Sequence, residues 1–310
     1  MTGRLLITTI LCALGLWSAA RAADGDARRP LLLAQNTSEL DRKIAEYSEE
    51  IRRNPTGTMA YNERAYAYME KGYFDRGIAD LSKLIELLPN DGQYYRMRGD
   101  AYGHTGDYDN AIADYDSWLA FSPNDITGHH NRGLAYRLKG DYQRAIADFG
   151  YNIQRHPDLG MDLLERGATR MMTADASSAI ADFNETLRVD AHDWEAILLR
   201  HFAGNRAGAG GASLSPAVTA DFERNKWPWP LLAFLTGQAS AADVRAAAAL
   251  GDETDRRAHL CGAAFWLGEN ELKMARPGAA KPLFDEATRR CPRLFFEYSL
   301  AKYELARLEK

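Results

Sequence analysis

Residues 98–123 have the sequence RGDAYGHTGDYDNAIADYDSWLAFSP, and residues 132–157 repeat its pattern as RGLAYRLKGDYQRAIADFGYNIQRHP. Arg98 and Arg132 are 34 residues apart, and the same spacing recurs at further positions of the chain. They form four columns: Arg64, Arg98, Arg132, Arg166 and Arg200; Asp80, Asp114, Asp148 and Asp182; Gly72, Gly106 and Gly140; and Pro89, Pro123 and Pro157. Several independent columns with one period indicate an internal repeat.

Each repeat predicts two helices. In residues 98–123 a small residue follows Arg98, a turn falls at Gly106-Asp107, and an alanine-rich stretch carries the aromatic Tyr115. Pro123 then ends the second helix, because proline disfavours a helical conformation at the residue before it. We expect an all-α fold, a right-handed solenoid in which each helical hairpin buries its face on its neighbour.

The small residue, the aromatics, the glycine turn and the proline occupy the places typical of a tetratricopeptide repeat (TPR), and the chain resembles that family. The resemblance implies four full repeats, at 58–91, 92–125, 126–159 and 160–193, and a partial fifth that ends the array at residue 206. In the fourth repeat Ala174 replaces the turn glycine. The array would be preceded by a segment (23–57) with a capping or dimerisation helix. It would be followed by an irregular helical region (207–310) with a degenerate repeat at 261–294.

The stretch 1–22 resembles an export signal. Arg4 precedes an apolar run from Leu5 to Trp17, and Ala20-Arg21-Ala22 offers small residues for cleavage after Ala22. Cys12 lacks the small residues that a lipidation site needs before it, so we expect no stable membrane anchor after cleavage; an uncleaved N-terminal anchor is the alternative. In a two-membrane bacterium the exported chain would be periplasmic.

Composition limits the classes of function. The 310 residues carry a net charge of −5, and removal of Arg4 and Arg21 with the signal makes it −7. This acidic balance disfavours a nucleic-acid-binding protein. The histidines lack metal-ligand spacing, and no glycine-rich phosphate loop or Gly-x-Ser-x-Gly motif occurs, so we expect no metal, no cofactor and no enzyme activity.

The arginine and aspartate columns predict structural ion pairs. Arg64, Arg98, Arg132 and Arg166, each on a first helix, would pair with the column aspartates on second helices, which fixes the register between hairpins; an anion-binding ladder of arginines is the alternative. Cys261 and Cys291 fall at neighbouring ends of two antiparallel helices, so in an exported protein they form either a disulfide or two buried thiols.

The TPR resemblance also implies a groove, lined by the first helices, that holds a partner segment. The corresponding residues are Asn62, Tyr66, Arg96, Asp100, His130, Asn131, Leu134, Arg137, Leu164 and Met171. Alternatively, the groove is filled by the protein's own termini or by a second copy. Trp227 and Trp229, each followed by proline, are either a partner contact or a plug at the junction between the array and the C-terminal helices.

The order of elements over the whole mature chain, with the stretches Ala264–Gly268 and Glu297–Ala301, is similar to the bacterial NlpI envelope protein family. That resemblance implies a dimeric, non-enzymatic adaptor that docks periplasmic proteases and peptidoglycan hydrolases. Members of that family are lipid-anchored, whereas this signal lacks the lipid site. The alternatives are a periplasmic assembly or secretion chaperone for extended clients, and an enzyme with its site in 204–250.

Overall fold

The computed structural model describes residues 29–207, 214–224 and 226–309, so the proposed signal segment 1–22 lies outside the described residues. Helices and turns make up the described parts, and the prediction of an all-α series of helical hairpins is confirmed. Of the helices in these parts, none is long and apolar enough to cross a membrane.

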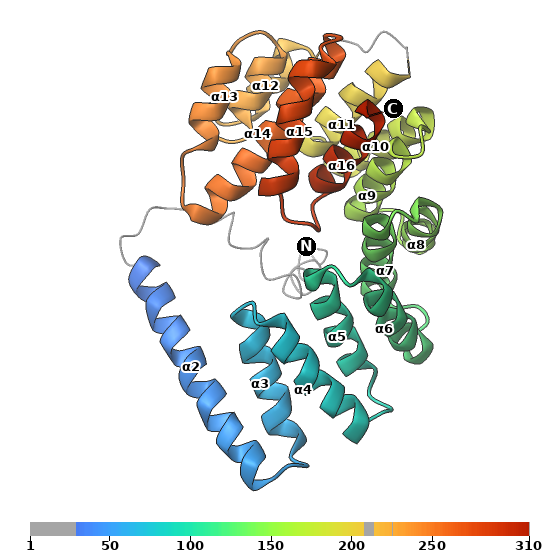
Figure 1. Cartoon of the computed structure of the whole chain (residues 1–310). Helices are drawn as coiled ribbons and strands as arrows, with labels where there is room; N and C mark the ends of the chain where they lie inside the picture. Colours follow the sequence, from blue (N-terminus) through green and yellow to red (C-terminus); the bar gives the residue numbers. More distant parts are fainter. Residues whose placement is uncertain (1–28, 208–213, 225, 310) are drawn as a thin grey trace. The chain divides into compact units, whose positions relative to one another are not determined.

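The helices keep the labels of Figure 1. They are α2 (Arg29–Arg53), α3 (Thr58–Glu70), α4 (Phe74–Leu87), α5 (Gly92–Thr105), α6 (Tyr108–Phe121), α7 (Ile126–Lys139), α8 (Tyr142–Arg155), α9 (Gly160–Met171), α10 (Ala176–Val189), α11 (Trp194–Arg206), the 3₁₀ helix η3 (Pro216–Asp221), α12 (Trp229–Leu235), α13 (Ala241–Ala248), α14 (Glu253–Lys273), α15 (Pro277–Arg290) and α16 (Phe296–Leu308). The helices of the four full repeats begin and end inside the ranges predicted for them.

The chain divides into two compact units, Met1–Ala135 and Tyr136–Lys310, and the division falls within α7. It does not follow the expected boundary between the array and the C-terminal region at residue 206. The reason is that helices from both sides of that boundary share one core in the second unit. A single buried cluster there includes Leu164 of α9, Phe202 of α11 and Leu300 of α16.

The turns between paired helices are built in the same way in successive repeats. Asp107, Asp141 and Asp175 each accept a hydrogen bond from a backbone amide in the first turn of the following helix, which caps an otherwise unpaired donor. Gly106 ends α5 in the left-handed region at φ 88°. Ala174 holds the equivalent position at φ 60°, so the fourth repeat keeps this turn without its glycine.

Close packing between paired helices explains the small residue in each first helix. A Cβ atom on Gly99 would lie 2.9 Å from the Tyr115 ring, and one on Gly167 would lie 2.5 Å from the Phe183 ring. Gly268 stands in the same relation to Phe284, at 2.8 Å. The α14–α15 hairpin therefore has the packing of a repeat, although its first helix already begins at Glu253, ahead of the predicted start at Cys261.

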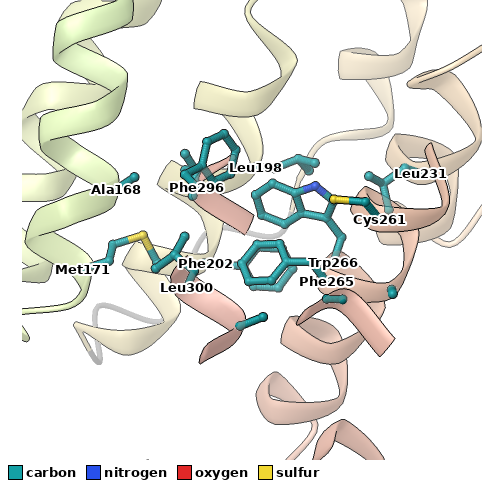
Figure 2. Packing of buried hydrophobic residues seen from close by; sticks show 14 of the residues in the cluster. Ala168, Met171, Leu198, Phe202, Leu231, Cys261, Phe265, Trp266, Phe296 and Leu300 are labelled. Atoms are coloured by element: carbon teal, nitrogen blue, oxygen red, sulfur yellow. The ribbon is translucent and has the colours of Figure 1, made fainter. Parts of the chain in front are cut away.

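Aromatic side chains fill the core of the second unit (Figure 2). The ring of Trp266 stacks on that of Phe202 with centroids 5.6 Å apart, which joins α14 to α11. Phe296 and Leu300 of α16 belong to the same cluster as Met171 of α9. The C-terminal helix is thus an integral layer of this unit.

Candidate functional site

The structure brings together three of the four predicted Arg–Asp pairs. Each guanidinium donates two hydrogen bonds to its aspartate, with lengths between 2.6 and 3.1 Å. These pairs are Arg64–Asp80, Arg98–Asp114 and Arg166–Asp182. Arg132 and Asp148 belong to different units, so their pairing stays a prediction. Such bidentate bonds set the register of the two helices in a hairpin, which fits the structural interpretation of the two columns.

Arginines of this column also reach back to the preceding second helix, a contact that the sequence analysis missed. Arg98 donates to Ser82 at 2.9 Å, and Arg132 donates to Asp116 at 2.7 Å. Arg64 donates in the same way to Ser48 at 3.0 Å, which places α2 where the second helix of a preceding repeat would lie. The acceptor of this second bond differs between repeats: it is serine for Arg64 and Arg98, aspartate for Arg132, and asparagine (Asn184) for Arg200. Because the residue type varies, the common spacing is not evident in the sequence.

One side of α3 in the first unit stays open. Met59 is 71% exposed and Tyr66 is 49% exposed, with the half-buried Asn62 between them at helical spacing. Ala65 of α3 and Met97 of α5 belong to one core cluster, and Tyr66 of α3 interacts electrostatically with Tyr94 of α5, so this side of α3 lies near α5. We call Met59, Asn62, Tyr66, Arg96 and Asp100 the α3–α5 face. It offers both apolar and polar side chains on which a partner segment could rest.

Asp100 is the centre of a polar cluster on this face. Tyr115 donates its hydroxyl to Asp100 Oδ1 at 2.9 Å, and Asn131 Nδ2 donates to the same oxygen at 3.0 Å. Arg96 donates to the other oxygen at 3.1 Å. Burial raises the pKa of Asp100 to about 6, while Arg96 and the two hydrogen bonds oppose the rise. Arg96, Asp100 and Asn131 are predicted groove residues, whereas Tyr115 belongs to the core-facing aromatic column and was not predicted at this site.

The remaining predicted groove residues do not line an open surface. His130, Asn131 and Leu134 are buried in the first unit. Arg137, Leu164 and Met171 are buried in the second unit. There α9 packs against α16, and Leu164 and Met171 share a buried cluster with Phe296 and Leu300 of that helix. The prediction of an open groove is wrong for these positions, and the alternative in which a terminus of the chain fills the groove holds for the second unit.

Arg137 joins α7 to the segment that leads into α16. Its Nη2 atom donates to the Leu294 carbonyl at 3.0 Å and lies 3.3 Å from a carboxylate oxygen of Glu165. Burial raises the pKa of both Glu195 and Glu297, and repulsion from nearby carboxylates, Glu165 among them, adds to the rise. The pKa of Glu297 reaches about 7. Three carboxyl groups from three helices therefore interact with one another, and Arg137 lies beside two of them, Glu165 and Glu297.

The two cysteines of the C-terminal region are joined. Cys261 of α14 and Cys291 at the end of α15 form a disulfide, with Cα atoms 4.8 Å apart. Trp227 takes the junction position between helices: its ring stacks on His259 at 4.7 Å and meets Trp194 edge-on at 6.2 Å. Within the described residues, no three His, Cys, Asp or Glu side chains are placed to hold a metal ion.

Comparison with known proteins identifies the repeats. A tetratricopeptide repeat model matches residues 60–91, and a TPR repeat model matches residues 99–140. The chain therefore carries tetratricopeptide repeats, whose general role is to mediate contacts between proteins. Among curated proteins none matches the chain significantly.

Two solved structures share the fold. A tetratricopeptide repeat protein from Parabacteroides merdae is 18% identical, with a TM-score of 0.56 over 82% of this chain and 99% of that one. The C-terminal part of a TPR repeat-containing protein from Cytophaga hutchinsonii is 14% identical, with a TM-score of 0.53 over 86% of this chain and 96% of that one. At these identities the likeness concerns the arrangement of helices alone.

Proposed function

We propose that the chain is a non-enzymatic adaptor of the bacterial envelope that docks a partner protein on the α3–α5 face. The observation that carries this proposal is the exposure of Met59 and Tyr66 beside the Asp100 cluster. Large apolar and aromatic side chains at the centre of a surface patch are the groups that contribute most to protein–protein affinity. TPR repeats supply the general class of function, a scaffold for protein interactions.

The finer proposal concerns location and partners. The apolar segment before Ala22 supports export, and the similarity of the whole chain to NlpI-type proteins supports a periplasmic protease or peptidoglycan hydrolases as partners and a homodimer as the working form. A disulfide between Cys261 and Cys291 is compatible with an oxidising compartment. Fractionation of cells that express the full chain with a C-terminal tag tests the location: recovery in the cytosol would contradict it.

The partner proposal is tested by capture from envelope extract with the full chain. The variant M59S/Y66A removes both exposed side chains, and Tyr73→Ala is the matched control because Tyr73 is 46% exposed and lies outside the face. We expect wild type and control to retain one or two proteases or peptidoglycan hydrolases, and the double variant to retain at least tenfold less.

Other outcomes discriminate between the functions. Equal capture by the double variant would show that the α3–α5 face is not the docking site. Many unfolded clients instead of defined enzymes would indicate a chaperone. Turnover of a substrate by the purified protein alone would indicate an enzyme.

A further inference from the structure

An unbalanced group of charges lies where the C-terminal helix begins. At its start, Glu297 of α16 faces Glu165 of α9 and Arg137 of α7. Glu195 of α11 interacts electrostatically with Glu297, Asp193 and Glu165. Asp193 also caps the N-terminus of α11. This group thus contains four carboxyl groups, and Arg137 lies beside two of them, Glu165 and Glu297, while its Nη2 atom also donates to the Leu294 carbonyl.

The polar atoms of this group are poorly satisfied. Arg137 is 1% exposed, and its Nε and Nη1 atoms find no hydrogen-bond partner among the described residues. Glu297 is 4% exposed. Removal of a carboxylate from water without full pairing costs more than the burial of its neutral acid, so burial favours the protonated forms of Glu195 and Glu297.

The other end of α16 is balanced. Arg206 of α11 lies 2.6 Å from Glu269 and 2.7 Å from Glu304, and Arg307 lies 2.7 Å from Glu304. Two arginines therefore match two glutamates, and Lys281 pairs with Glu309 at the exposed end of the helix. The excess of acidic groups is confined to the first turns of α16.

We propose that α16 is a proton-dependent latch: protonated carboxyl groups of Glu195 and Glu297, beside Glu165, keep its first turns docked on α9 and α11, and their ionisation releases them. Release would open the part of the core cluster in which Leu164 and Met171 of α9 lie together with Phe296 and Leu300 of α16. The latch is a property of the second unit and does not depend on partner docking at the α3–α5 face.

The direction of the pH effect follows from linkage. In the released state Glu297 is hydrated and has its ordinary pKa of 4.5, whereas burial raises its pKa to about 7 in the docked state. Protons therefore bind the docked state more strongly, and the docked state loses stability as pH rises through this window. For Glu297 alone, the opening equilibrium is expected to be about 70-fold more favourable at pH 8 than at pH 5.

Hydrogen exchange of the full oxidised chain tests the latch. The informative backbone amides are those of residues 300–303, which bond to the carbonyls of the first helical turn. After correction for intrinsic exchange rates, we expect their protection to fall by about 70-fold from pH 5 to pH 8. Amides of α10 serve as the internal reference and should change much less.

Variants show which groups are responsible. Glu297→Gln should flatten the pH dependence, and Glu195→Gln should reduce it by removing one repulsive charge. Glu309→Gln is the control, because Glu309 is exposed at the far end of the same helix. Equal protection at both pH values in the wild type, or a flat profile in the Glu309 variant, would overturn the latch. Should Glu297→Gln fail to fold, Glu195→Gln alone must still weaken the pH dependence, or the proposal is wrong.

Discussion

The guanidinium of Arg98 donates two hydrogen bonds, each 2.8 Å long, to the carboxylate of Asp114. The third nitrogen of the same guanidinium donates to Ser82 of the preceding hairpin at 2.9 Å. One arginine thus fixes the register inside its own hairpin and the contact with the hairpin before it. Repetition of this arrangement at Arg64 explains why the two columns share one period.

Loss of Asp114 should destabilise the first unit. Asp114 is 4% exposed, and Asp114→Ala leaves the partly buried Arg98 guanidinium without its anionic partner. We expect the free energy of unfolding in urea to fall by about 2–3 kcal/mol. Glu86→Ala removes an exposed partner of Lys83 and should change it by less than about 0.5 kcal/mol. Similar losses in the two variants would show that the buried pair has no special role.

The glycine at position 167 should not tolerate a methyl group. Gly167→Ala places a Cβ atom 2.5 Å from the Phe183 ring, inside a core that cannot move freely. We expect a loss of about 1–3 kcal/mol in thermal or urea unfolding. Gly278 has no atom within 4 Å of the corresponding Cβ position, and Gly278→Ala in the first turn of α15 should be neutral or stabilising. A neutral Gly167→Ala would mean that α9 and α10 can separate.

Ala174 should be improved by glycine. Its φ of 60° lies in the left-handed region, which disfavours a residue with a Cβ atom. Ala174→Gly should therefore raise the free energy of unfolding by about 0.5–1 kcal/mol, although the more flexible unfolded chain offsets part of the gain. The reciprocal change Gly106→Ala, at φ 88°, should cost about 1–2 kcal/mol. Calorimetry of both variants distinguishes strain at this turn from a general effect of glycine.

The disulfide should stabilise the second unit. It closes a loop between positions 30 residues apart, and the chain-entropy model assigns such a loop about 3–4 kcal/mol. The double variant C261S/C291S should lower the melting temperature, and a reductant should lower that of the wild type without affecting the variant. Mass spectrometry of unreduced peptides should find Cys261 linked to Cys291. Free thiols at both positions in protein purified from an oxidising compartment would contradict the bond.

Asp100 should titrate near pH 6. Its protonated form is favoured in the folded state, so its contribution to stability is complete below pH 4 and is lost as pH rises through about 6. Carboxyl carbon NMR should follow this midpoint directly. Tyr115→Phe removes a hydrogen bond to the charged form and should move the midpoint upward, whereas Leu88→Ala at an exposed site should leave it unchanged. A midpoint near 4 in the wild type would contradict the burial of this carboxyl group.

Much of the fold followed from local patterns. The spacing of Gly106 and Pro123 marks where helices turn and end, because glycine alone adopts the left-handed region easily and proline lacks an amide hydrogen. These constraints act over short stretches of chain, so the repeats of the array could be located without a structure. The fourth repeat shows the limit, since Ala174 keeps the turn at the expense of strain.

The site was harder to predict because accessibility depends on distant parts of the chain. Asn62, Tyr66 and Leu164 fall at groove positions of their repeats, yet Tyr66 is half exposed and Leu164 is buried. The difference comes from α16, which begins only at Phe296, far along the chain from α9, and still packs against it. No periodicity in residues 160–171 could reveal that cover.

The sequence by itself determined the helical hairpins, their common period and the arginine and aspartate columns, because these depend on residues at fixed spacing. Only the tertiary structure decided which groove positions remain open. Apolar surface is buried by whichever segment packs against it, and here the C-terminal helix covers the second unit while Met59 and Tyr66 stay exposed in the first. The same packing brings Glu165, Glu195 and Glu297 near one another, with Arg137 beside Glu165 and Glu297, an arrangement that no single stretch of sequence contains.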